Sequence, residues 1–213
     1  MTKYGISLAK DVCVQSSVQA LKSIRVSNFK QLEKVFKQDE NIKILYLTRD
    51  PRAMFNSRRK FGVRDTKGIC KRYKDNYWYL SKHLDKESWL KERLYYIRYE
   101  DLSWLPHHYT GEIYDFLNME PDENLNKWID SNTRDSTGEH YFNTKRDSRK
   151  NLQKWRGQLS WKSVKSIQED CSDMMRIFGY LPFKNEKDYR DLSIDYFDKN
   201  WRVFNEPVLS NYY

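Results

Sequence analysis

The sequence contains no long apolar segment, no internal repeat and no low-complexity stretch. No apolar run in its first thirty residues approaches the roughly 20 residues that a membrane-spanning helix requires. We therefore expect neither an anchor nor a targeting segment in these residues. Lysine and arginine are not gathered into blocks either, which argues against a disordered basic arm of the kind that binds nucleic acid.

Cysteine is scarce, and Cys13, Cys70 and Cys171 are far apart in the sequence. Three is an odd number, so at least one of these thiols has no partner within the chain, and a cytosolic protein would keep all three reduced. None stands near another cysteine or near a pair of histidines, so the spacing fits no zinc site. We expect no bound metal.

The sequence is rich in positive charge and in aromatic side chains. The formal net charge is +9 and the isoelectric point is near 9.3, so an anionic partner is expected. A nucleotide, an anionic glycan and a nucleic acid all meet that condition. The 16 tyrosines and seven tryptophans could stack on adenine or sugar rings, although most aromatic side chains belong to cores.

Apolar periodicity predicts strands that alternate with helices in a chain whose 213 residues suit one domain. Such alternation is typical of an α/β fold, with a parallel sheet covered by helices. The predicted strands are 21–26, 42–48 and 94–99. The predicted helices are 10–20, 29–37 (capped by Asn28), 51–60, 66–86, 107–117, 123–131, 149–156 and 160–178, the last ending at Gly179.

The segment 42–58 is the most informative part of the sequence. It begins as an apolar run of strand length and changes at Arg49-Asp50-Pro51 into a sequence with helical character. Asp50 suits an N-cap, and Pro51 suits the first helical position, where its missing N–H costs nothing. A strand that leads directly into a helix forms an anion site, because the first N–H groups of the helix are unpaired and point outward. Positive charge and a hydroxyl donor are supplied there by Arg49, Arg52, Arg58, Arg59 and Ser57. The alternative is an ordinary strand–helix junction with a solvated basic face.

The letters RDPRA…SR after a hydrophobic strand resemble the 3′-phosphate-binding motif of sulfotransferases that use 3′-phosphoadenosine 5′-phosphosulfate (PAPS). More narrowly, they resemble the Golgi carbohydrate sulfotransferases that modify N-acetylglucosamine, galactose or chondroitin. The resemblance implies that Arg49 and Ser57 hold the 3′-phosphate of the donor. A bidentate guanidinium and a short hydroxyl donor suit a phosphate dianion, and lysine would not reproduce the guanidinium fork.

Further segments resemble this family in the same order along the chain. They are CVQSSVQALKSIR (13–25), GICKRYKD (68–75), RYEDL (98–102), FLNME (116–120) and the closing WR…C…FGY pattern that ends at Tyr180. The resemblance covers about residues 10–183. It implies a partial P-loop-type sulfotransferase fold, with a domain at 1–183 that is incomplete at its N-terminus. Residues 184–213 lie beyond the match and are expected to form a polar, poorly ordered tail.

The family's R-x-G-S-S loop, which cradles the 5′-phosphosulfate with backbone N–H groups, is absent. The nearest serine pair, Ser16-Ser17, has no glycine beside it. The family's N-terminal membrane anchor is absent as well. The resemblance therefore implies a fragment of a longer Golgi-membrane enzyme whose domain faces the lumen, and this chain alone should transfer sulfate poorly or not at all.

A lumenal origin would also imply a disulfide bond, because disulfides persist in oxidising compartments. The resemblance then favours Cys70 with Cys171 as the bridged pair. Cys13 would pair with a residue outside this sequence.

Several other residues that match the family have two interpretations each. Glu100 and Asp101, at a strand end, could act as acids or bases, or could cap the next helix or pair with an arginine. Trp155 and Arg156 could border the nucleotide or anchor the packing. The polar loop 131–149 could contact the donor's phosphates or an anionic glycan, or could be merely solvated; its basic residues are Arg134, Lys145, Arg146 and Arg149.

We predict a sulfotransferase that transfers a sulfuryl group from PAPS to a hydroxyl of a carbohydrate. Its partners would be the nucleotide donor and a glycan acceptor, and no residue is assigned as the catalytic base. One alternative is a decayed paralogue that binds the nucleotide or a sulfated glycan without chemistry. A nucleic-acid-binding module ranks third, because the sequence shows none of the recognition motifs of that class.

Overall fold

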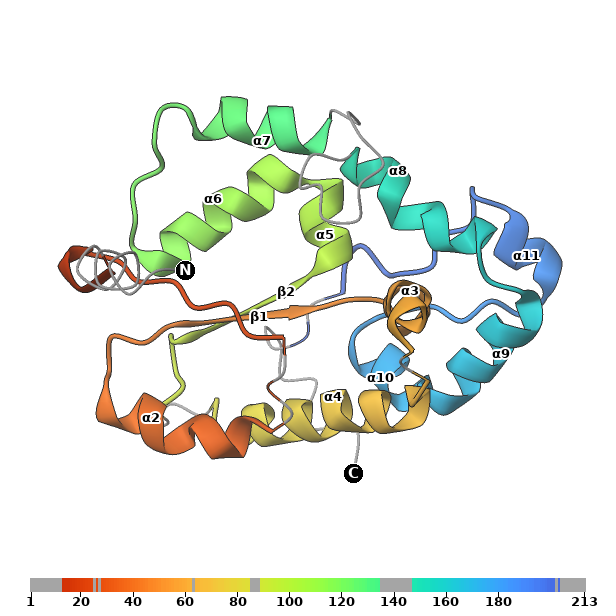
Figure 1. Cartoon of the computed structure of the whole chain (residues 1–213), viewed down its shortest axis with the longest axis horizontal. Helices are drawn as coiled ribbons and strands as arrows, with labels where there is room; N and C mark the ends of the chain where they lie inside the picture. Colours follow the sequence, from red (N-terminus) through yellow and green to blue (C-terminus); the bar gives the residue numbers. More distant parts are fainter. Residues whose placement is uncertain are drawn as a thin grey trace, which may run out of the picture.

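The computed structural model describes residues 13–24, 26, 28–62, 64–84, 89–134, 147–201 and 203. At its centre lies a sheet of two parallel strands, β1 (Ile44–Thr48) and β2 (Leu94–Arg98). Ile44 pairs with Leu94 and Thr48 with Arg98, so the two strands end at the same level. The α/β class, with a parallel sheet flanked by helices, is thus confirmed (Figure 1).

The helices form two groups beside the strands and a third group beyond their carboxyl ends (Figure 1). On one side lie α5 (Tyr99–Trp104), α6 (Pro106–Leu117) and α7 (Leu125–Thr133), and on the other lie α2 (Glu33–Gln38) and α4 (Thr66–Ser81). Toward the carboxyl ends lie α3 (Pro51–Arg58), α8 (Ser148–Gln153), α9 (Trp161–Asp170), α10 (Ser172–Ile177) and α11 (Glu186–Arg190). Three 3-10 turns complete the described elements: η1 (Phe29–Leu32), η2 (Arg59–Phe61) and η3 (Lys154–Gly157).

Aromatic side chains fill the core between the sheet and α4. The buried ring of Tyr46 lies 5.2 Å from that of Phe29 and 6.4 Å from that of Phe178, centroid to centroid. On the opposite face of the sheet, Tyr95 packs against Phe116 of α6 at 5.4 Å. These rings therefore serve packing, which is the commoner role of aromatic residues.

Local signals predicted the ends of several elements correctly. The Asn28 side chain accepts a hydrogen bond from the Lys30 N–H at 2.9 Å and caps the helical segment that begins with η1. Gly179 has a φ of +71° just after α10, and the next N–H, of Tyr180, donates to the Met175 carbonyl at 2.8 Å. This is the left-handed helix end that favours glycine.

The predictions for the first part of the chain are wrong where the structure describes it. Of the predicted helix 10–20, residues 13–15 are helical and residues 16–20 are not. The described part of 21–26 forms no strand, and Leu21 is 96% exposed. A strand requires a neighbour to satisfy its backbone groups, and periodicity alone does not supply one.

Two helical segments differ in detail from the predictions. Residues 99–104 form α5 directly after β2, whereas the sequence predicted that the strand would extend to Tyr99. The predicted helix 160–178 is divided at Cys171 into α9 and α10. Cys171 is where α9 is joined covalently to α4, which is a tertiary constraint invisible to periodicity.

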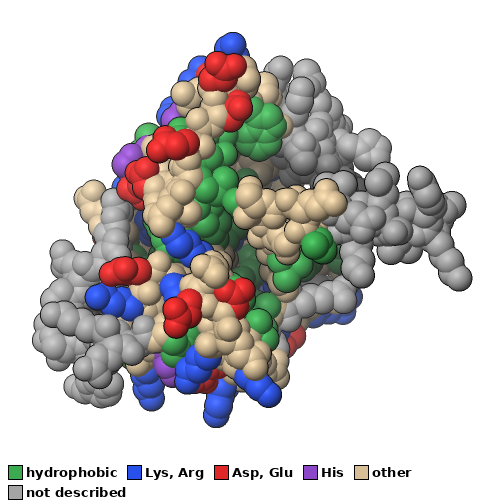
Figure 2. All heavy atoms as spheres, turned by 90° about the vertical axis from the view of Figure 1, so that its left-hand side faces the viewer, with side chains coloured by type: hydrophobic (Ala, Val, Ile, Leu, Met, Phe, Trp, Pro, Cys, Tyr) green, Lys and Arg blue, Asp and Glu red, His purple; other side chains and the backbone are tan. Residues whose placement is uncertain are grey.

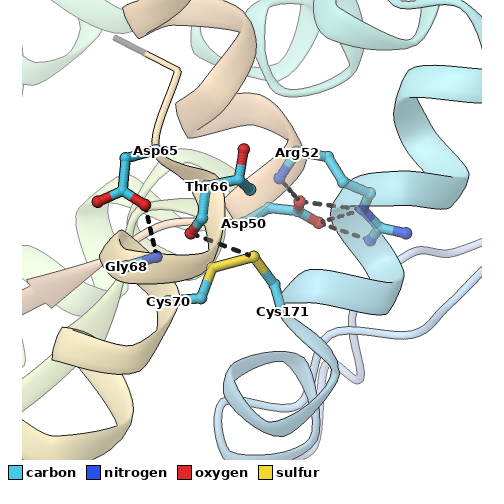
Figure 3. The surroundings of a disulfide bond; sticks show 7 residues. All are labelled: Asp50, Arg52, Asp65, Thr66, Gly68, Cys70 and Cys171. Carbon is cyan, nitrogen blue, oxygen red and sulfur yellow. Dashed lines mark hydrogen bonds and ion pairs between the residues drawn. A yellow bond between two sulfur atoms is a disulfide. The ribbon is translucent and has the colours of Figure 1, made fainter.

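Cys70 of α4 and Cys171 form a disulfide bond, so the predicted pairing is confirmed (Figure 3). The two cysteines are 101 residues apart in the sequence, and both are buried. Cys13 is exposed and is not disulfide-bonded. The bond ties the helix that covers the sheet to the helices beyond the strand ends.

Residues 184–201 are not a poorly ordered tail, and that part of the prediction is wrong. This segment contains α11 and buries Tyr189, Tyr196 and Phe197. Three buried arginines donate hydrogen bonds to backbone carbonyls at 178–198. Arg52 bonds Leu181 and Tyr196; Arg98 bonds Phe178, Gly179 and Asp198; Arg156 bonds Asp188, Tyr189, Asp191 and Ile194. Residues 202 and 204–213 of the predicted tail lie outside the described residues.

Two further findings apply to the described residues only. Among them, no helix is both long and apolar enough to cross a membrane. They also contain no cluster of three or more His, Cys, Asp and Glu side chains that could hold a metal ion.

Candidate functional site

The turn between β1 and α3 has the geometry that the sequence predicts. Asp50 is the N-cap of α3, and its carboxylate accepts the Arg52 N–H at 2.7 Å. Pro51 is the first residue of the helix. Asp50 is fully buried, and its backbone N–H donates to the Glu100 Oε1 at 3.1 Å. The turn is therefore tied by a hydrogen bond to the start of α5, which follows the neighbouring strand.

Arg49 lies at the carboxyl end of β1, immediately before this turn. Its guanidinium carbon lies 4.3 Å from the ring centroid of Tyr99, a cation–π contact. The Tyr99 hydroxyl accepts a hydrogen bond from the Asn151 Nδ2 at 2.9 Å, which fixes the ring. The Arg49 Nε is buried and has no hydrogen-bond partner. A buried donor of this kind calls for an acceptor, and an anionic ligand would supply one.

Ser57 lies on the last turn of α3, where it is exposed. It is seven residues beyond the N-cap, which corresponds to about 10 Å along the helix axis. No hydrogen bond joins Arg49 to Ser57. The structure thus places them at the two ends of one short helix, and their joint role toward a phosphate stays a prediction.

Arg52 and Arg59, two further arginines of the motif, bond residues of the fold. Arg52 is fully buried and forms an ion pair with Asp50, its Nη2 lying 2.6 Å from Oδ2 (Figure 3). Because its remaining donors bond Gln168 and carbonyls of the C-terminal segment, Arg52 has no donor to offer an anion. Arg59 donates to the Gln158 carbonyl at 3.1 Å. Of the motif's arginines, Arg49 is the one with a buried donor left over.

Glu100 is buried between the two strand ends. Its Oε2 accepts the Tyr180 hydroxyl at 3.0 Å, and its Oε1 accepts the Asp50 N–H. Burial and, next, the neighbouring Asp50 carboxylate raise the pKa of Glu100 to about 7, against the opposing effect of Arg49. This carboxyl has no exposed surface to offer a substrate, so its geometry suits a positioning role.

For Asp101, Trp155 and Arg156 the sequence left a functional and a structural role open, and the structure shows the structural one. Asp101 forms a bidentate pair with the buried Arg98, at 2.6 and 2.8 Å. Trp155 and Arg156 are both buried, and Arg156 donates to four carbonyls near α11. These side chains anchor the packing.

A cleft of about 560 Å³ lies between the start of α6, the end of α7 and the start of α8. Its walls include Trp104, His107, Arg134 and Arg149. The Arg149 guanidinium lies 5.2 Å from the Trp104 ring centroid, while Arg134 pairs with Asp130 at 3.1 Å. Of the predicted basic loop, Arg134 and Arg149 thus border a cleft. Lys145 and Arg146 lie outside the described residues.

Comparison with known proteins identifies the family. A sequence model described as "Sulfotransferase family" matches residues 11–123, which is 113 of the 213 residues. The chain belongs to the sulfotransferase family. The match includes β1, the Arg49 turn, α3 and β2, and it ends before α7.

Curated relatives of this sulfotransferase-family chain are carbohydrate sulfotransferases. The chain is 29% identical to carbohydrate sulfotransferase 1 of Rattus norvegicus, over 89% of the chain and 51% of that protein. It is 26% identical to carbohydrate sulfotransferase 3 of Homo sapiens, over 83% and 41%. With carbohydrate sulfotransferase 4 of Mus musculus the identity is 26%, over 88% and 55%. The chain thus spans about half the length of the curated relatives it matches.

Proposed function

We propose that this chain is part of a carbohydrate sulfotransferase and that Arg49, with Ser57, binds the 3′-phosphate of PAPS. The observation that carries the proposal is the buried, unpartnered Nε of Arg49 at the carboxyl end of β1. Ligands of parallel α/β sheets bind at the carboxyl ends of strands, and the helix that follows contributes its positive end there. Family membership supports a nucleotide as the ligand and a carbohydrate as the acceptor.

In this proposal the donor supplies a sulfuryl group, whose bond to the phosphate oxygen breaks as a bond forms to a sugar hydroxyl, and the hydroxyl proton passes to a base. The residues of this chain bind and orient the nucleotide. Tyr99 holds the Arg49 guanidinium in place, and Asp50 and Glu100 fix the turn that carries it. No described residue is assigned as the base, because Glu100 and Asp101 are both committed to structural partners.

The disulfide supports the proposed compartment. Disulfides are rare in the cytosol and persist in oxidising compartments, and Cys70–Cys171 is buried within the fold. The Golgi lumen, where carbohydrate sulfation takes place, satisfies that condition. We therefore propose a lumenal location for the domain.

Calorimetric titration with adenosine 3′,5′-bisphosphate tests the site directly. Arg49→Ala should weaken binding by about 1.5–3 kcal/mol, roughly 10- to 150-fold, because a charge-assisted hydrogen bond to the phosphate is lost. Arg49→Lys should recover only part of that loss, since an ammonium cannot form the bidentate contact. Ser57→Ala should have a smaller effect in the same direction.

Two controls make this titration specific. Arg64, an exposed arginine outside the motif, provides the matched variant Arg64→Ala, which should bind like the unmodified chain. Adenosine 5′-monophosphate lacks the 3′-phosphate, so Arg49→Ala should change its binding little. Equal losses for the two nucleotides, or no loss for either, would contradict the assignment.

Binding without turnover is the second candidate function. It is favoured by the structural roles of the two carboxylates that follow β2, because Asp101 pairs with Arg98 and Glu100 accepts the Tyr180 hydroxyl. A transfer assay with radiolabelled PAPS and a sugar acceptor decides between the candidates, because both require the nucleotide but only the first forms sulfated product.

A further inference from the structure

We propose that the start of α4 is a second binding surface, which holds an acidic polysaccharide chain beside α3. This basic surface consists of Arg64, just before the helix, and of Lys67, Lys71 and Lys74 on the helix itself. The inference rests on the proposed function for its carbohydrate acceptor. It goes beyond that function by naming the class of the acceptor chain and the residues that retain it.

Most of the excess positive charge of the chain lies in one short stretch. Residues 58–75 contain eight lysines and arginines and two aspartates, which gives a net charge of +6, whereas the whole chain has +9. Other residues interrupt the basic ones within this stretch, so the sequence shows no continuous basic block. Which of these side chains share a surface is determined by the fold.

The fold brings the lysines of this stretch together on the outer face of α4. Residues three or four positions apart are neighbours on a helix surface, and Lys67, Lys71 and Lys74 have that spacing. Ile69 and Leu80, on the opposite face, are buried. α4 lies at the outer edge of the molecule, on the side of the sheet away from α6 and α7 (Figure 1). Figure 2 views the molecule from the end at which α2 lies, and it shows Lys and Arg side chains gathered along the same edge.

The first part of the basic surface has positive charge to offer a ligand. Arg64 and Lys67 are exposed and form no ion pair with any residue that the structure describes. Lys71 pairs with Asp75 at 2.6 Å, but the two side chains are 69% and 51% exposed. An exposed pair of this kind contributes little to stability, so an anionic ligand can compete for the lysine.

The carboxylates around the rest of the basic surface are shared or committed elsewhere. Asp173 lies 2.9 Å from Lys74 and 3.5 Å from Arg176, so two cations share one anion. Asp65 is the N-cap of α4, and its carboxylate accepts the Gly68 N–H at 2.8 Å. A net positive charge therefore remains along the whole row.

The length of the basic surface fits a chain of acidic sugars. Lys67 and Lys74 are seven residues apart, which is about 10 Å along the helix axis, and Arg64 extends the row beyond the helix. Carboxylate or sulfate groups that repeat along a polysaccharide can contact such a row in turn, whereas a single anion would contact one or two of its members. Phe61, three residues before Arg64, is 68% exposed and offers an aromatic face to a sugar ring.

The disulfide argues against two other polyanions, nucleic acid and anionic lipid. Cys70, which precedes Lys71 on the same helix, is bonded to Cys171, and disulfides persist in oxidising compartments. Anionic lipids give the cytoplasmic leaflet its negative potential, and nucleic acids lie on the same side of the membrane. A glycan is thus the polyanion that this surface would meet in an oxidising compartment.

Fluorescence anisotropy with a labelled galacturonate decamer tests the proposal, because this probe carries a carboxylate on every sugar. The full chain should bind the decamer, and the affinity should fall steeply as the salt concentration rises from about 50 to about 200 mM. Arg64→Glu/Lys67→Glu/Lys71→Glu should weaken binding by about 10- to 100-fold, because three attractive contacts become repulsive. Arg64→Gln/Lys67→Gln/Lys71→Gln removes the charges without reversing them and should cause a smaller loss.

The matched control is Lys127→Glu/Lys162→Glu/Lys184→Glu, which changes the net charge equally at three exposed lysines elsewhere in the chain. It should bind the decamer nearly as the unmodified chain does, and the uncharged methyl ester of the decamer should not bind. Equal losses in the two Glu variants, equal binding of the ester, or no binding of the decamer would overturn the proposal. Phosphatidylserine vesicles that bind this surface when the decamer does not would also overturn it, because the occupant would then be a membrane. Nucleotide binding is measured separately by calorimetry with Arg49→Ala, so either proposal can fail alone.

Discussion

At the scale of single residues, the same residue type has opposite roles within one motif. Arg49 and Arg52 are three positions apart, yet the Arg52 guanidinium donates its hydrogen bonds to Asp50 and to carbonyls of the C-terminal segment. Arg49 keeps a buried donor without a partner. The difference arises from their positions, because Arg49 precedes the N-cap Asp50 whereas Arg52 is the second residue of α3.

Glu100 is the residue whose charge state should influence stability most clearly. Its pKa of about 7 lies above the usual 4.3 of a glutamate in an unfolded chain, so the folded state binds the proton more tightly. Its contribution to the free energy of unfolding is therefore fully present below about pH 4 and is lost as the pH rises through 7. Glu100→Gln has no such proton to lose. The free energy of unfolding of the unmodified chain should fall relative to that of Glu100→Gln between pH 5 and 8, by on the order of 3 kcal/mol.

Urea denaturation at pH 5, 6, 7 and 8 measures this difference. The histidines and the other carboxylates titrate in both proteins, so their effects cancel in the comparison. A constant difference between the two proteins across this range would mean that Glu100 has an ordinary pKa, and the buried environment described here would then be wrong.

At the scale of elements, a buried arginine holds the C-terminal segment 184–198 in place, although much of that segment is neither helix nor strand. The Arg156 Nε and Nη atoms bond the carbonyls of Tyr189 and Ile194 at 2.9 and 3.0 Å, and two further carbonyls near α11. Backbone carbonyls outside helices and sheets need such partners when they are buried. A planar guanidinium has five N–H donors and can therefore bond several carbonyls at once, whereas an ammonium has only three donors.

Arg156→Ala should therefore release the segment 184–198 selectively. We expect a loss of about 3–5 kcal/mol in the free energy of unfolding, because several buried carbonyls are left without a donor. Hydrogen exchange should accelerate in 184–198 while β1 and β2 stay protected. Arg190→Ala serves as the control and should cost much less, because it removes only one hydrogen bond to a backbone carbonyl, that of Arg156, along with an exposed ion pair to Glu186 and a contact with the Tyr189 ring. Uniform acceleration throughout the chain would show that the segment is not a separable unit.

The predictable elements are those whose signals are local. The β1–α3 junction was predicted because an apolar run, an N-cap and a proline stand in consecutive positions. The strand predicted at 21–26 failed because strand formation depends on a neighbour, and Leu21 and Ile24 have none to pack on. The packed C-terminal segment was missed for a similar reason. Its contacts reach back as far as Arg98, whose Nη2 bonds the Asp198 carbonyl across 100 residues of sequence.

At the scale of the whole molecule, long-range contacts of this kind join Arg52, Arg98 and Arg156 to residues 178–198. The disulfide is the one covalent link of that kind among the described residues. It closes a loop of 101 residues between α4 and the α9–α10 junction. Closing a long loop restricts the unfolded chain, which raises the free energy of unfolding. The sheet has only two strands in the described residues, so its own contribution to stability is small and this restraint matters more.

Cys70→Ser/Cys171→Ser should lower the free energy of unfolding by about 2–5 kcal/mol, and a reducing agent should produce a loss of similar size in the unmodified chain. Cys13→Ser removes an exposed cysteine that is not disulfide-bonded, so denaturation with and without reductant should be unchanged by it. If Cys13→Ser lowered stability as much as the double variant, a different pairing would have to exist in solution. If reduction had no effect, the arginine contacts alone would hold the C-terminal half on the sheet, and the case for an oxidising compartment would lose its structural basis.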